Sequence, residues 1–309
     1  MRRLRLYLLL LLLGPLSQAA TAQYYFLNDR FYDNDWIVEA GGTMGIMNAL
    51  TDLGGNKGIG KPFLKDLNLE TTNLSGGVYF TGMYRSLIGV RLEACFGQVE
   101  GADSLLKDIR TSTFGRFERN LSFKSKISDV QVGVEFHPLF LPRYLSGEGD
   151  SPPFSPYVLA GVGFFAFEPK AELNGQWYSL QPLRTEGQGF PQYRDRKPYS
   201  LQQRNYHVGA GVRMELTNFI VARIEIDHRI LTTDYLDDVS QDSYIEPTLF
   251  AQHLSPGRAA IASQIFFRSA ELNPPDAFSV NYQRGNPRNK DSYFTLQLKL
   301  GVMLGRQRR

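Results

Sequence analysis

The chain has 309 residues and a formal net charge of +3, from 34 Lys and Arg against 31 Asp and Glu. Arg2, Arg3 and Arg5 account for the whole positive excess, so the rest of the chain is formally neutral and gives no sign of nucleic-acid binding. The single cysteine, Cys95, can form no internal disulfide, so disulfides do not hold the fold. The content of Tyr, Phe and Gly fits an all-β chain, either soluble or in a membrane.

The N-terminal 22 residues have the three parts of a secretory signal peptide. The basic start is followed by an apolar run from Leu6 to Leu13 and by the small residues Ala20-Thr21-Ala22, where signal peptidase would cut. That run is shorter than the roughly 20 residues that a membrane-spanning helix needs, which argues against a membrane anchor. We therefore predict a signal peptide over residues 1–22 and an exported chain.

Beyond the signal peptide, apolar residues alternate with polar residues or glycine, which is the period of a β-strand. In residues 87–98, for example, Val90 and Leu92 alternate with Arg91 and Glu93. The pattern recurs, in strict or weaker form, in seven further segments: residues 36–47, 73–84, 129–137, 156–167, 206–215, 220–230 and 294–304. The sequence therefore predicts eight strands.

The polar faces of these strands distinguish a membrane barrel from a soluble sandwich. In a sandwich the polar face meets bulk water, whereas here it carries glycine and charges of both signs, which suit a narrow lumen where charges must pair. The expected lumen network is Arg91, Glu93, Glu135, Arg213, Glu215, Arg223, Glu225, Asp227 and Lys299. We predict an all-β fold, an antiparallel transmembrane β-barrel over residues 36–304, whose strands of about 10–12 residues match the height of a bilayer core.

The lengths of the connections give this barrel an orientation. Short connections, such as Arg85-Ser86 and Thr217-Asn218, alternate with long ones at residues 48–72, 99–121, 168–203 and 232–290. Outer-membrane barrels have short periplasmic turns and long extracellular loops. We therefore expect the N-terminal segment 23–35 and the basic C-terminal tail 305–309 to be periplasmic.

The last long connection has structure of its own. Residues 256–272 begin with proline, contain several alanines and end before Asn273-Pro274-Pro275, which predicts a short helix over the barrel mouth. An additional hairpin hidden in residues 232–290 would instead give ten strands.

The sequence contains no pattern typical of a catalytic site. Its four histidines, at positions 137, 207, 228 and 253, lie in different segments. Barrels that deacylate lipid A carry a serine two residues after an outward histidine, and this chain has Ile230 two residues after His228. We therefore expect a non-enzymatic protein without a cofactor.

Two features of the long loops are candidates for binding. Asp234, Asp237 and Asp238 cluster carboxylates as calcium sites do, but their spacing matches no calcium loop, and aspartates at a strand end also satisfy free backbone amides. We therefore predict no metal site. Trp177 and Tyr178 could grip a glycan or a protein, or could pack the loops together, which we favour.

Four stretches make the chain similar to Bacteroidota-type outer-membrane barrels of the PorG-like kind, a family largely of unknown function. They are residues 48–68 (NALTDLGGNKGIGKPFLKDLN), 115–123 (GRFERNLSF), 174–190 (NGQWYSLQPLRTEGQGF) and 229–240 (RILTTDYLDDVS). The resemblance implies a link between the type IX secretion apparatus and the outer membrane through periplasmic ring proteins.

The expected function is therefore an anchor or scaffold in the outer membrane. Its expected partners are outer-membrane lipid and lipopolysaccharide, with periplasmic or surface proteins in addition. One alternative is a surface protein that binds a glycan or host ligand through its extracellular loops. Another is a lipid-modifying enzyme.

Overall fold

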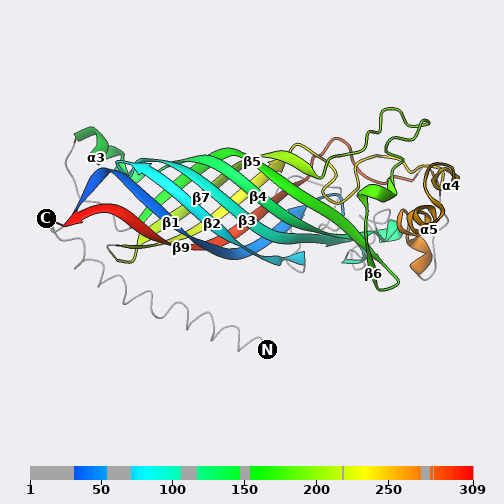
Figure 1. Ribbon diagram of the computed structural model, residues 1–309, viewed down its shortest axis with the longest axis horizontal. Helices are drawn as coiled ribbons and strands as arrows, with labels where there is room; N and C mark the ends of the chain where they lie inside the picture. Colours follow the sequence, from blue (N-terminus) through cyan, green and yellow to red (C-terminus); the bar gives the residue numbers. More distant parts are fainter. Residues whose placement is uncertain are drawn as a thin grey trace.

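The computed structural model describes residues 31–53, 71–105, 117–146, 154–217, 219–272, 279–280 and 282–308. The strands are β1 (Phe31–Leu50), β2 (Asn73–Tyr84), β3 (Ile88–Ala102), β4 (Ser122–Phe136), β5 (Phe154–Leu173), β6 (Gln176–Ser179), β7 (Gln202–Glu215), β8 (Ile220–Leu231) and β9 (Ser292–Arg308) (Figure 1). The helices are η3 (Pro138–Phe140), α3 (Leu141–Ser146), η4 (Gln181–Leu183), α4 (Thr248–His253), α5 (Pro256–Ile265) and η5 (Ser269–Glu271), where η denotes a 3-10 helix. The predicted signal peptide, residues 1–22, lies outside the described residues.

Eight of these strands form one closed antiparallel barrel. Neighbours pair in the order β4-β3-β2-β1-β9-β8-β7-β5, and β4 also pairs with β5, which closes the sheet. The strand β6 only extends β5 as a hairpin at one end. In the described part of residues 232–290, the one β pairing is an isolated bridge between Ser243 and Gln283, so that segment adds no hairpin to the barrel. The predicted eight-stranded barrel is confirmed.

Within the described ranges, no helix is long and apolar enough to span a membrane.

Side chains alternate between the outside of the barrel and its interior, as the period of a strand requires. On β3, Val90 and Leu92 are 55% and 50% exposed, whereas Arg91 and Glu93 are each 1% exposed. The barrel thus exposes apolar residues and buries charged ones, which is the reverse of a protein surrounded by water. Such an outer wall is stable in an apolar solvent, the interior of a bilayer.

Aromatic residues mark the two edges of this apolar wall. Outward-facing Trp36, Phe136, Phe154 and Phe219 lie near the end where β1 begins and β9 finishes, which we call the termini end; Phe96, Phe164 and Tyr206 lie toward the opposite end. On β5 the two edges fall at Phe154 and Phe164. The strand between them has the roughly 9–11 residues that a tilted strand needs to cross a bilayer. We call the wall between the two edges the apolar belt.

Beyond the belt, away from the termini end, the polarity of the two faces is exchanged. Within the belt Val130 of β4 faces outward and Asp129 is buried, whereas farther out Lys126 faces outward and Ile127 is buried. The outside there meets water, and the interior becomes an apolar core. The strands consequently extend beyond their predicted limits, with β4 beginning at Ser122 and β5 ending at Leu173.

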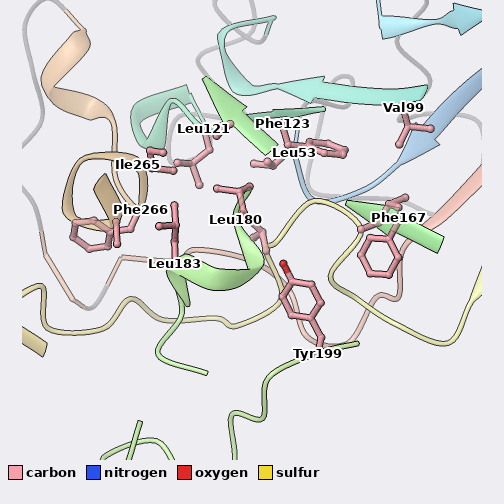
Figure 2. Packing of buried hydrophobic residues seen from close by; sticks show 14 of the residues in the cluster. Leu53, Val99, Leu121, Phe123, Phe167, Leu180, Leu183, Tyr199, Ile265 and Phe266 are labelled. Carbon is pink, nitrogen blue, oxygen red and sulfur yellow. The ribbon is translucent and has the colours of Figure 1, made fainter. Parts of the chain in front are cut away.

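The described parts of the long connections fold together into one cap over this end of the barrel (Figure 1). Their apolar residues and the inward residues of the outer strand ends form a single cluster, the cap core (Figure 2). Its buried members are Met47, Leu53, Cys95, Val99, Leu121, Phe123, Ile127, Phe165, Phe167, Ala171, Leu180, Leu183, Phe190, Tyr199, Leu231, Leu236, Val239, Tyr244, Ile245, Leu249, Phe250, Ala259, Ala262, Ile265, Phe266 and Tyr293. Barrel and cap are therefore one packed unit.

The short helix predicted in the last long connection is present as α5. It begins at Pro256, as predicted, but ends at Ile265 rather than at residue 272. Phe266 directly after it packs into the cap core against Phe250, with ring centroids 5.2 Å apart. Residues 266–268 are not helical, and the short 3-10 helix η5 follows them. The stop predicted at residues 273–275 lies outside the described residues.

The barrel also extends farther at its termini than the predicted limits of 36 and 304. β1 begins at Phe31 and β9 ends at Arg308, and these two residues pair with each other. The register of the pairing between the two strands shifts between Asp33 and Val38. The described parts of segments 23–35 and 305–309 are therefore strand rather than separate tails. The two strands can extend because each satisfies the backbone N–H and C=O groups of the other.

Connections at the termini end differ in length. The predicted turn between β2 and β3 is tight, with Arg85 and Ser86 both left-handed at φ values of 50° and 56°. The longer connection between β4 and β5 instead contains η3 and α3.

Candidate functional site

Charged side chains fill the barrel interior, and Arg91 lies at their centre. Its guanidinium contacts the carboxylates of Glu93 (3.1 Å), Glu225 (2.6 Å) and Glu135. Lys299 places its Nζ 2.5 Å from Glu93 and 2.8 Å from Glu225. These residues come from β3, β4, β8 and β9, so the pairs connect strands across the interior.

A second group of ion pairs lies closer to the termini end. Arg223 bridges Glu39 and Glu135, with its Nη1 2.8 Å from Glu135. Arg213 contacts Glu39 at 2.6 Å and Glu215 at 2.8 Å. Because Glu39 and Glu135 each bind two arginines, this group is continuous with the one around Arg91.

A third group lies toward the cap. Arg229 is 3.3 Å from both Asp129 and Asp227. The Nε2 and Nδ2 groups of Gln131 and Asn205 donate to Asp227 and Asp129, at 3.1 and 2.9 Å. Buried charges are tolerated when they are paired and hydrogen-bonded in this way.

The structure places all nine residues of the expected lumen network in the interior. None is more than 9% exposed, and each contacts an oppositely charged side chain. Glu39, Asp129 and Arg229 belong to the same network and were not in the expected set. Glu39 lies in the weakly alternating first strand, and the other two lie where the polarity of the faces changes.

Two tyrosines fill much of the remaining space in the interior. The hydroxyl of Tyr157 donates to Glu225 at 2.5 Å, and Arg223 lies over the rings of Tyr79 and Tyr157 at 5.4 and 5.3 Å. Gly301 faces Tyr79 so closely that a Cβ at this position would lie 2.3 Å from its hydroxyl. Any larger residue at position 301 would clash with Tyr79, so glycine here makes room for the tyrosine ring. The interior is therefore packed with side chains rather than hollow.

One arrangement in the interior has the composition of a catalytic triad. Ser155 Oγ lies 3.2 Å from His137 Nδ1, and His137 Nε2 lies 3.1 Å from Glu135 Oε2. All three side chains are buried, and Glu135 is bound by two arginines. Because all three side chains are buried and Glu135 is already held by arginines, we assign these residues to the lumen network. Sequence alone does not connect Ser155 with His137, because they lie at opposite ends of a long connection.

The cap contains buried ion pairs of its own. Arg119 contacts Asp103 at 2.6 Å and also donates to the backbone carbonyls of Asp52 and Arg284. Arg284 in turn contacts Glu186 at 3.0 Å. These contacts join segments that are far apart in the sequence, so the cap has a defined arrangement.

Two of the three aspartates proposed for loop binding, Asp237 and Asp238, accept hydrogen bonds inside this cap. Asp237 accepts hydrogen bonds from the backbone N–H groups of Leu53 (3.0 Å) and Val239 (2.9 Å). Asp238 accepts hydrogen bonds from the hydroxyls of Tyr199 (2.6 Å) and Thr185. Across the described ranges, no group of three or more His, Cys, Asp or Glu residues could hold a metal ion. These carboxylates thus tie the loops together.

Burial makes these carboxylates sensitive to pH. It raises the pKa of Asp234 to about 8 and that of Asp238 to about 7, and burial beside Asp52 raises the pKa of Asp237. In the unfolded chain these groups titrate near pH ~4, so between pH ~4 and ~8 the folded state binds more protons than the unfolded state. Their contribution to stability is therefore lost as the pH rises through this range.

We accordingly expect the protein to melt at a higher temperature at pH 6 than at pH 8.5. Near-ultraviolet circular dichroism of the protein in detergent would measure this difference. Asp237→Asn should reduce the difference, because the amide is neutral at both pH values. An equal or higher melting temperature at pH 8.5 would contradict this account of the cap.

Trp177 and Tyr178 lie on β6, in the hairpin that projects from the barrel. Asn174 and Gly175 form its turn with φ values of 52° and 80°. Trp177 is 38% exposed, with Lys124 Nζ 3.3 Å from its ring centroid, and the Tyr178 hydroxyl donates to Gln176 at 2.9 Å. Tyr178 also packs against the cap core, so only the tryptophan presents substantial aromatic surface.

These features define the class of protein. The eight strands form a closed antiparallel barrel with an apolar belt and a charged interior, so each strand is paired on both sides, as membrane-spanning strands must be. This architecture is that of the outer-membrane β-barrels.

Comparison with known proteins finds only distant structural likeness. The N-terminal barrel domain of Pseudomonas aeruginosa OprF is 8% identical, with 88% of this chain and 100% of that one covered and a TM-score of 0.34. Ail of Yersinia pestis is 12% identical, with 86% and 99% covered and a TM-score of 0.36. A major outer membrane protein of Thermus thermophilus is 14% identical, with 87% and 99% covered and a TM-score of 0.35. No protein-family profile and no curated sequence matches the chain, so the similarity to PorG-like barrels stays a prediction.

Proposed function

We propose that this chain is a non-enzymatic outer-membrane anchor that holds a folded cap outside the cell and contacts protein partners through its two ends. The observation that supports this most is the packing of the interior. Arg91, Arg223 and Lys299, all nearly fully buried, occupy the space that a channel would need. The cap covers one end with a core shared with the barrel. Function then belongs to the two end surfaces.

The proposed orientation places both termini in the periplasm and the cap outside. It is supported by the tight turn at Arg85-Ser86, which is at the same end as the termini, and by the long connections at the other end. In a Cys95→Ser background, cysteines at Ser200 and Asn289 in the cap should react with a membrane-impermeant maleimide on intact cells. A cysteine at Thr217 should react only after the outer membrane is opened. The opposite pattern would reverse the proposed orientation.

The most specific form of this proposal is that the anchor is an accessory component of type IX secretion. This form rests on the similarity to PorG-like barrels. In that case the periplasmic end would contact a periplasmic ring protein. The second candidate is a surface protein that binds glycans, favoured by the exposed Trp177 beside Lys124. Aromatic faces and cations are both common in ligand recognition.

Site-specific photo-crosslinking in living cells separates these functions. A crosslinking amino acid at Thr217 reports on the termini end, and one at Tyr282, which is 39% exposed, reports on the cap. The anchor predicts discrete protein adducts from Thr217. The glycan-binding alternative predicts no such adducts, together with glycan binding that Trp177→Ala abolishes. That second result would replace the anchor with a surface receptor.

A further inference from the structure

The connection between β4 and β5 exposes an unusual amount of apolar surface. Leu139 in η3 is 45% exposed, and in α3 Leu141, Tyr144 and Leu145 are 40%, 41% and 74% exposed. Phe140, in contrast, is turned inward, with its ring edge-on to His137 at a centroid distance of 6.5 Å. Three exposed leucines within seven residues would be unfavourable in water, because apolar surface is stabilised by removal from water. We therefore expect this surface to be covered.

The position of α3 indicates what covers it. Arg85 lies between α3 and the edge of the apolar belt, 5.8 Å from the ring centroid of Tyr144 and 5.6 Å from that of Tyr84. Tyr84 packs against Trp36 with ring centroids 5.2 Å apart, and Arg85 Nε is 2.8 Å from Asp35. The tyrosine of α3 is thus connected to the aromatic edge of the belt.

The strand ends on either side of this connection carry apolar belt residues. Phe136, at the end of β4, and Phe154, at the start of β5, are outward-facing belt residues at 38% and 53% exposure. Trp, Tyr and Arg are also the side chains that favour the boundary between the headgroups and the acyl chains.

We propose that η3 and α3 form an interfacial anchor that lies in the headgroup region of the leaflet at the termini end, with phospholipid covering Leu141 and Leu145. Short apolar segments of this kind enter the boundary between headgroups and acyl chains by about 5–10 Å. The anchor would fix the depth of the barrel at this end and limit its tilt. The proposal requires the barrel to span a bilayer, but it does not depend on which side the termini face or on any protein partner.

Tryptophan quenching in vesicles tests this directly. Leu145→Trp, in a Trp36→Phe, Trp177→Phe background, places a single reporter at the most exposed position of α3. The protein is reconstituted into phosphatidylcholine–phosphatidylglycerol vesicles whose acyl chains carry bromine close to the headgroup, deep in the chain, or not at all. The α3 reporter should lose most of its emission with the shallow bromines and much less with the deep ones. A Tyr282→Trp reporter in the cap, in the same background, should keep its emission in all three.

A solvent-like emission from the α3 reporter that bromines do not quench would overturn the proposal. That result would mean that α3 faces water and that lipid does not cover its apolar surface. Folding is checked separately, because folded barrels migrate faster than boiled ones on gels. Since these vesicles contain no other protein, the result does not depend on whether the anchor function holds.

Discussion

Replacing Arg223 with methionine should lower the free energy of unfolding of the barrel by about 3–5 kcal/mol. Arg223 is fully buried and is shared by Glu39 and Glu135, so its removal leaves two buried carboxylates with less compensating charge. The methionine retains much of the volume but provides no hydrogen bonds. Urea unfolding of the protein in vesicles, followed by the mobility of the folded form on gels, would measure the loss.

Two further variants separate buried pairing from a general loss of charge. Arg194→Met removes an exposed arginine of the cap and should change stability by no more than about 0.5 kcal/mol. Glu39→Gln combined with Arg223→Met should cost less than the sum of the two single changes, by about 0.5–3 kcal/mol, because the residues are in contact. If Arg223→Met lowers the free energy of unfolding no more than Arg194→Met does, the interior is solvated. The interpretation of the lumen as packed would then be wrong.

The sequence identified the inward face of most strands because the two solvents of a membrane barrel impose a strict period of two. Arg91 and Glu93 sit two residues apart on that face, and so do Arg223 and Glu225. Which partners meet was not predictable. Arg91 contacts Glu225 across 134 residues of sequence, and such contacts depend on how the strands are staggered around the closed barrel.

Of the cap, the sequence predicted the short helix over the barrel mouth but not the apolar core that the cap shares with the barrel. Its strands keep their period of two, but Lys126 outside and Ile127 inside have the opposite polarity to the belt, which makes the pattern look broken. Its aspartates resembled a binding site because acidic loop residues are usually exposed. Asp237 is instead buried and accepts a hydrogen bond from the backbone N–H of Leu53, which is 184 residues away in the sequence.

The protein should show no stable conductance of porin size in a planar bilayer. An eight-stranded barrel leaves an interior just wide enough for side chains, and here Arg91, Arg223 and Tyr157 occupy it. On this account the packed interior, rather than the cap, is what blocks the passage of ions. A variant in which residues 248–265 are replaced by a short glycine–serine linker should therefore be equally silent, provided that it still gives the folded form on gels.

A known porin reconstituted in the same way serves as the positive control for insertion. Steady openings from the unmodified protein would contradict both the packed interior and the proposed anchor. Openings confined to the variant without α4 and α5 would show that the cap is the plug and that the charged interior admits ions. Silence in both would leave the packed interior as the barrier, where ion pairs of 2.5–3.3 Å join strands across the barrel.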